Sequence, residues 1–129
     1  MGTWLIRISV IYLFLGTALG MYMSITGDFE LSSVHTHLSL IGWTTMTLAG
    51  IIYSIFPKLA QSVLCKIQFI LFNTGLPIMM TGLVLLISGP GPVAVVSVGA
   101  TITSIAILFF TINVLTGLKS IPDIENDRN

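Results

Sequence analysis

The chain has 129 residues, of which 54% are hydrophobic and only 8% are charged, and its formal net charge at pH 7 is zero. A water-soluble domain of this size needs far more charged surface, so this composition excludes one, and no basic surface suited to nucleic acid is present. A bilayer crossing takes roughly 20 apolar residues, which leaves length for four crossings and little else. We therefore predict an all-α integral membrane protein, a single four-helix bundle within residues 1–121.

Charged residues and helix breakers divide the chain into four apolar stretches. We expect these spans at about residues 4–24, 34–56, 64–88 and 93–118. Pro57 ends the second span, and a Gly-Pro-Gly-Pro turn follows the third. Residues 122–129 form a polar tail. For the first stretch a cleaved signal peptide is the alternative, because Ala18 and Gly20 suit a processing site, but its length favours a retained helix.

All basic residues fall on one side of this topology. They lie near the N-terminus, in the second connection or near the C-terminus: Arg7, Lys58, Lys66, Lys119 and Arg128. The first connection carries only Asp28 and Glu30, and the third carries no charge. Because cytoplasmic loops are enriched in lysine and arginine, we expect a multi-pass protein of the plasma (inner) membrane with both termini in the cytoplasm.

The two histidines, His35 and His37, lie at the start of the second span. The simplest interpretation is that they are interfacial residues bonded to loop backbone or lipid headgroups. Residues two apart on a helix differ by about 200°, so the two side chains cannot chelate one ion from the same helix. A chelated zinc or copper ion is therefore disfavoured. Separate axial ligation of iron porphyrins, one on each side of the helix, fits this geometry.

The second and third spans resemble a known family. The second begins with His35-Thr36-His37-Leu38, continues through Gly50-Ile51-Ile52-Tyr53 and ends at Phe56-Pro57, and so resembles the tenth helix of heme-copper oxidase subunit I. Lys66-Ile67-Gln68-Phe69, followed by Asn73 and Pro77, resembles the start of its eleventh helix. By position, the whole chain matches the last four of twelve helices. The resemblance implies that His35 ligates a high-spin heme and His37 a low-spin heme.

The chain also departs from that family. The family takes its copper ligands and a further low-spin heme ligand from histidines on other helices, and this chain has no other histidines. Where the family places arginines near the heme propionates, the chain has the turn from Gly89 to Pro92. No acidic residue lies within the predicted spans. Oxygen reduction and redox-driven proton pumping are therefore not expected.

The family's twelve helices form three four-helix units with approximate threefold symmetry, and one unit has the size of this chain. In a ring of three copies the interfaces are heterologous, so His37 of one protomer can face His35 of the next. Each interface then holds one complete bis-histidine site. We therefore expect a homo-oligomer, with a cyclic trimer favoured.

Other polar and small residues are expected to serve helix packing. Gly16 and Gly20 form a small-xxx-small pattern that lets helices approach closely, and Asn73 and Asn113 are expected to hydrogen-bond between helices. Tyr53 and Trp43 are interpreted as packing or interface anchors rather than as cofactor contacts.

These features predict a membrane b-type cytochrome that binds heme b between protomers through His35 and His37, transfers electrons to or from a respiratory redox partner, and has no catalytic residue. Two alternatives remain open. One is a heme held by a single histidine, whose sixth position binds or reduces a diatomic gas. The other is a cofactor-free membrane scaffold or assembly factor.

Overall fold

The computed structural model describes residues 1–119, and these are helical apart from short connections. The elements are α1 (Gly2–Thr26), α2 (Ser32–His37), η1 (Leu38–Thr45), α3 (Met46–Ile55), α4 (Pro57–Ala60), α5 (Val63–Ser88) and α6 (Val93–Leu118). Because α2, η1 and α3 follow each other without a break, we call Ser32–Ile55 the second rod. The second rod, α1, α5 and α6 are each long and apolar enough to span a membrane, which confirms the prediction of an all-helical chain with four such helices. The predicted tail, 122–129, lies outside the described residues.

The middle of the second rod is a π-helix. Element η1 begins directly after His37, and within it the Thr44 and Thr45 hydroxyls donate to carbonyl oxygens five residues earlier, Ser39 O at 3.0 Å and Leu40 O at 2.8 Å. The wider turn changes the rotation between the two ends of the rod. The faces that α2 and α3 present to their neighbours are therefore not those of one straight α-helix. Such segments are rare and are frequent at functional sites.

Local sequence explains where the second rod ends and α5 begins. Phe56 has φ −116° and ψ 79°, outside the α-region, as steric conflict with a following proline favours. Pro57 then takes the first position of α4, where its missing N–H costs no hydrogen bond. Ser62 caps α5 by accepting a 3.0 Å hydrogen bond from the Cys65 N–H.

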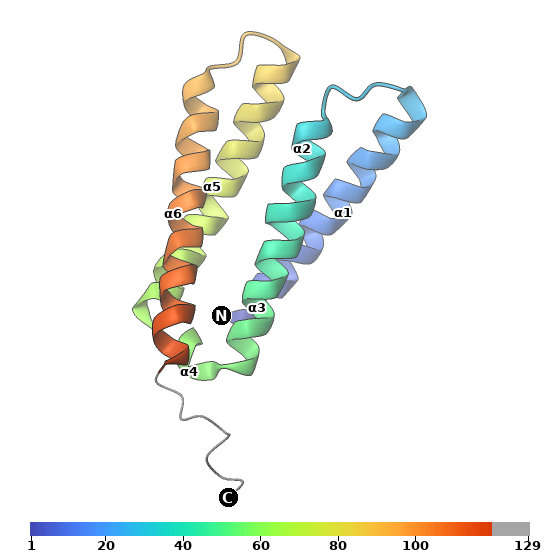
Figure 1. Ribbon diagram of the computed structural model, residues 1–129. Coiled ribbons are helices and arrows are strands. Elements are labelled where there is room, and N and C mark those ends of the chain that lie inside the picture. Colours follow the sequence, from blue (N-terminus) through green and yellow to red (C-terminus); the bar gives the residue numbers. More distant parts are fainter. Residues whose placement is uncertain (120–129) are drawn as a thin grey trace, which may run out of the picture.

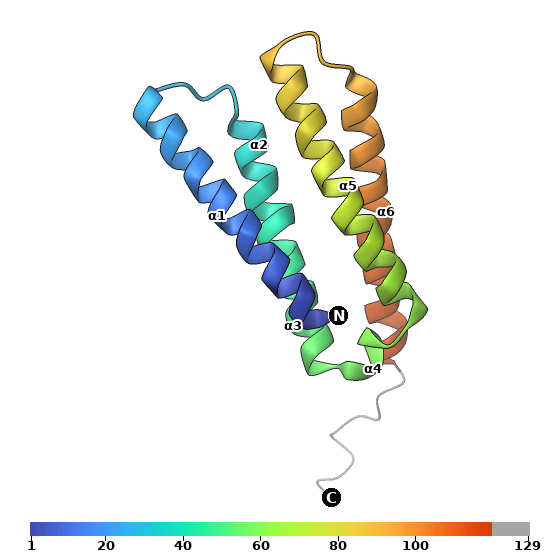
Figure 2. The ribbon, with the colours of Figure 1, turned by 180° about the vertical axis from the view of Figure 1, so that it is seen from behind.

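The helices form two hairpins, joined at one end through α4 (Figures 1 and 2). In the first hairpin α1 packs along the second rod, and in the second α5 packs along α6. The second hairpin is tight because Gly99 of α6 lies directly against the Met79 backbone of α5. Close approach through small residues compensates for the weak hydrophobic drive between helices in lipid.

A buried hydrogen-bond network ties the two hairpins together at the α4 end. Tyr53 of α3 donates to Gln68 Oε1 of α5 at 2.5 Å. Asn113 of α6 donates to the Tyr53 hydroxyl at 3.2 Å and to the Leu59 carbonyl of α4 at 3.1 Å. Asn113 thus bonds between helices as predicted. Asn73 instead donates to Phe69 O of its own helix at 2.7 Å.

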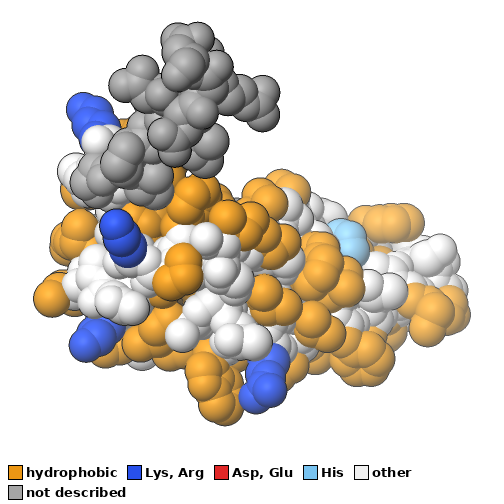
Figure 3. Space-filling view, turned by 90° about the horizontal axis from the view of Figure 1, so that it is seen from below, with side chains coloured by type: hydrophobic (Ala, Val, Ile, Leu, Met, Phe, Trp, Pro, Cys, Tyr) orange, Lys and Arg blue, Asp and Glu red, His pale blue; other side chains and the backbone are white. Residues whose placement is uncertain are grey.

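The α4 end also carries the basic side chains of the described residues. Figure 3 views the molecule from this end and shows lysine and arginine side chains around its rim, and no acidic side chain of residues 1–119 is seen in this view. Arg7, in the first turns of α1, lies with its guanidinium 5.3 Å from the centre of the Trp4 ring. Asp28 and Glu30 lie in the connection between α1 and α2, at the opposite end.

Candidate histidine site

Both histidines lie in α2, in the first two turns after the connection from α1. Both are half-buried, whereas Thr36 between them is exposed and its hydroxyl donates to Ser32 O of the same helix at 2.9 Å. Val34 and Leu38, on the side of α2 between the two histidines, are buried. The two imidazoles therefore flank the buried face of α2, one on each side.

His35 lies against α1. Its Nδ1 is 2.8 Å from the carbonyl oxygen of Gly16, nineteen residues earlier in the chain. Its ring also faces Gly20, because a Cβ atom built at Gly20 would lie 2.9 Å from His35 Cε1 and 3.2 Å from Nδ1. Two glycines one helical turn apart on α1 therefore lie beside the His35 ring. Gly16 accepts its hydrogen bond, and Gly20, which has no side chain, leaves the space that the ring occupies.

His37 is held by its own helix. Its Nδ1 is 2.7 Å from the carbonyl oxygen of Ser33, four residues earlier. No hydrogen bond joins His37 to another helix among residues 1–119. The two histidines thus differ in what orients them: an adjacent helix for His35 and the preceding turn of α2 for His37.

These bonds determine which ring nitrogen carries the proton. A carbonyl oxygen only accepts hydrogen bonds, so each Nδ1 must be the donor and must carry a hydrogen. In the neutral ring Nε2 then has a free lone pair. Within the described part of the chain neither Nε2 has a hydrogen-bond partner, and no buried polar side-chain atom is unpaired, so neither Nε2 is fully buried. In this tautomer Nε2 is the ring atom through which each histidine can ligate a metal.

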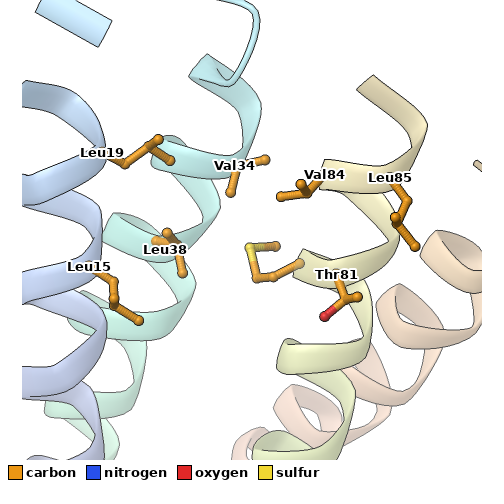
Figure 4. A pocket seen from close by; sticks show the side chains of 8 residues that line it. Leu15, Leu19, Val34, Leu38, Thr81, Val84 and Leu85 are labelled. Carbon is orange, nitrogen blue, oxygen red and sulfur yellow. The ribbon is translucent and has the colours of Figure 1, made fainter. Parts of the chain in front are cut away.

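A groove lies beside the histidines but does not contain them. It has a volume of about 450 Å³ and lies between the first hairpin and α5 (Figure 4). All lining side chains are apolar except Thr81: Leu15, Leu19, Val34, Leu38, Met80, Thr81, Val84 and Leu85. Because Val34 of α2 and Leu38 of η1 line the groove, a ligand within it would meet aliphatic side chains of the second rod and neither imidazole.

The residues described here do not bring three or more histidine, cysteine, aspartate or glutamate side chains together around one metal position. A metal ligated by His35 or His37 would need further ligands from outside this set of side chains. Axial ligation of a porphyrin iron is chemistry of this kind, since the macrocycle supplies four of the six donors.

The sequence prediction missed the role of Gly16 and Gly20 beside His35. The sequence contains both the small-xxx-small pattern and the histidine, but nothing in it indicates that His35 lies at the level of Gly16 and Gly20. The level at which His35 meets α1 depends on the length of the connection 27–31 and on how α1 crosses α2. Gln68, predicted only as part of a family resemblance, is the buried partner of Tyr53.

Comparison with known proteins found no relatives: no family model matches the chain, and no curated protein or solved structure is significantly similar to it.

Proposed function

We propose that this chain is a membrane b-type cytochrome that binds heme b through His35 and His37 at interfaces between protomers and serves in electron transfer. The observation that carries the proposal is the state of the two rings. Each donates Nδ1–H to a backbone carbonyl, and its Nε2 has no hydrogen-bond partner among residues 1–119 and is not fully buried. Metal-ligating histidines are typically oriented in this way, because the second-shell bond fixes the ring and raises its basicity.

The direction of the two rings supports ligation across protomers. His35 is on the α1 side of α2, and His37 is on the other flank of the Val34 and Leu38 face. Nothing in one chain brings their Nε2 atoms to a common point, whereas a closed ring of copies joins one His37 to one His35 at every interface. We propose a cyclic trimer as this ring.

Heme, when bound, supplies a one-electron couple at iron. The chain's own residues would provide two axial nitrogens and orient them. Two such ligands leave no open coordination position, which suits electron transfer rather than gas activation. His35 and His37 lie within about 9 Å of the start of α2 by the rise of an α-helix, so the cofactor would lie near the membrane surface at that end.

The absorption spectrum of the full chain, purified in detergent from heme-replete cells, tests this proposal. We expect a six-coordinate low-spin spectrum that carbon monoxide does not change, and about one porphyrin per chain after pyridine extraction, because a ring has as many interfaces as protomers. A spectrum altered by carbon monoxide would replace the proposal with a single-histidine gas site. A colourless protein would replace it with a cofactor-free scaffold.

The distribution of basic residues supports an orientation with both termini in the cytoplasm. Lys58, Lys66 and Lys119 lie at the α4 end together with Arg7, and the α1–α2 connection carries Asp28 and Glu30. By the bias of cytoplasmic loops toward lysine and arginine, the α4 end faces the cytoplasm of a plasma-membrane protein.

A reporter fused to the C-terminus is therefore expected to be active in the cytoplasm, and one inserted at Phe29 on the other side. Paired cytoplasmic and periplasmic reporters in intact cells measure both positions. The opposite pair of results would invert the topology and place the histidines at the cytoplasmic surface.

A further inference from the structure

We infer that Gly20 is a positioning residue for His35: without a side chain it uncovers the Gly16 carbonyl, and the bond to that carbonyl holds the His35 ring with Nε2 free. The inference about ring orientation stands on the geometry of α1 and α2. Only its consequence for heme rests on the proposed function.

The geometry of an α-helix explains why a glycine is needed at this position. The carbonyl of residue 16 points along the helix toward residue 20, and a side chain leans toward the helix N-terminus from its own Cα. A side chain at position 20 therefore stands over the carbonyl of residue 16. With glycine there, this oxygen can accept a second hydrogen bond from outside the helix through its other lone pair, and His35 Nδ1 donates it at 2.8 Å.

The space at Gly20 is filled by the histidine ring itself. A methyl group at position 20 would lie 2.9 Å from His35 Cε1 and 3.2 Å from Nδ1, both closer than ordinary contact, while Nε2 is farther away at 3.7 Å. The ring would have to turn or retreat, and either movement lengthens its bond to Gly16 O. By contrast, position 16 itself faces Ser39 Oγ at 3.1 Å and no ring atom.

The fixed bond has two consequences for ligation. It selects the tautomer with the hydrogen on Nδ1, so that Nε2 is the only ligating atom. It also removes rotational freedom from the ring before a metal arrives, and such second-shell contacts typically contribute about 10–100-fold to metal affinity. His37 lacks this anchor on an adjacent helix, since its Nδ1 bonds within α2.

The test compares Gly20→Ala with Gly42→Ala. Gly42 lies at the same contact between α1 and the second rod, and a Cβ atom there would lie 2.8 Å from Tyr12 Cγ. Both variants thus press a methyl group against a ring, but only one of the rings belongs to a histidine. In heme-free protein with ¹⁵N-labelled histidine, we expect wild type and Gly42→Ala to show His35 protonated at Nδ1. Gly20→Ala is expected to lose that signature while His37 keeps it.

A double-mutant cycle separates positioning from general packing. If the cost of the methyl group at position 20 is its conflict with the His35 ring, Gly20→Ala should lower thermal stability in the wild type, whereas in the His35→Ala background it should leave thermal stability unchanged or raise it, because alanine favours a helix over glycine. Equal losses in both backgrounds, or an unchanged His35 signal in folded Gly20→Ala protein, would overturn the inference.

In heme-loaded protein, we expect Gly20→Ala to lower heme affinity by about 10–100-fold relative to Gly42→Ala. This arm also separates the two proposals. If neither wild type nor control binds heme while the tautomer and stability results hold, the proposed function fails and the positioning role of Gly20 stands. If heme binds equally to all three proteins, His35 ligation does not depend on Gly20, and the consequence drawn for affinity is wrong.

Discussion

Replacing either His35 or His37 by alanine is expected to remove the low-spin heme spectrum entirely and to lower heme retention by more than the factor of about 10–100 that a lost second-shell contact costs. The reason is that each bis-histidine site in a ring takes one Nε2 from each residue, so the loss of either opens every site. The expectation is symmetrical although the two rings are oriented differently, His35 by Gly16 O and His37 by Ser33 O. Pyridine extraction and the absorption spectrum of the purified variants measure it.

Thr36→Ala is the matched control, because Thr36 lies between the histidines, is exposed and bonds only to Ser32 O of its own helix. Its spectrum and heme content should be those of the wild type. A twofold dimer gives a different pattern, since an isologous interface pairs two copies of the same histidine. One alanine variant would then keep its spectrum, and the wild type would hold about half a heme per chain.

Mixing the two alanine variants is expected to restore part of the spectrum that each has lost. A mixed ring of three contains a single interface at which an intact His37 meets an intact His35, so about one third of its sites should recover. Coexpressing the variants with different affinity tags and purifying through both yields only mixed oligomers. Heme per chain and the low-spin spectrum of this material give the fraction of recovered sites.

One control supports the interpretation of the mixing experiment. Each variant coexpressed with a differently tagged copy of itself should remain without heme, which shows that the tags do not create sites. Mixed oligomers of verified composition that stay colourless would show that heme, if bound by the wild type, is not ligated by His37 of one protomer together with His35 of the next. That outcome would remove the ring assembly from the proposal. The single alanine variants would then decide whether each histidine is a heme ligand.

The sequence alone was sufficient for the four membrane helices. The hydropathy of a segment depends only on its own residues, so a long apolar stretch bounded by charges or prolines can be recognised in the sequence. In lipid its backbone N–H and C=O groups must form hydrogen bonds within the segment, so the stretch forms a helix. The sequence also indicated that His35 and His37 point to different sides, because each residue of an α-helix is rotated by a fixed angle from the one before it. It did not reveal η1, since no residue type in Leu38–Thr45 specifies a π-helical turn.

Only the tertiary structure decided which groups each polar side chain meets. Asn73 and Asn113 are the same residue type in adjacent helices, but Asn113 has the Tyr53 hydroxyl and Leu59 carbonyl opposite it, whereas Asn73 bonds back to Phe69 O. Likewise, His35 meets the carbonyl that Gly20 uncovers because α1 crosses α2 at that level. A hydrogen bond requires two groups within about 3 Å, and for residues on different helices that distance is set by packing, which sequence spacing does not encode.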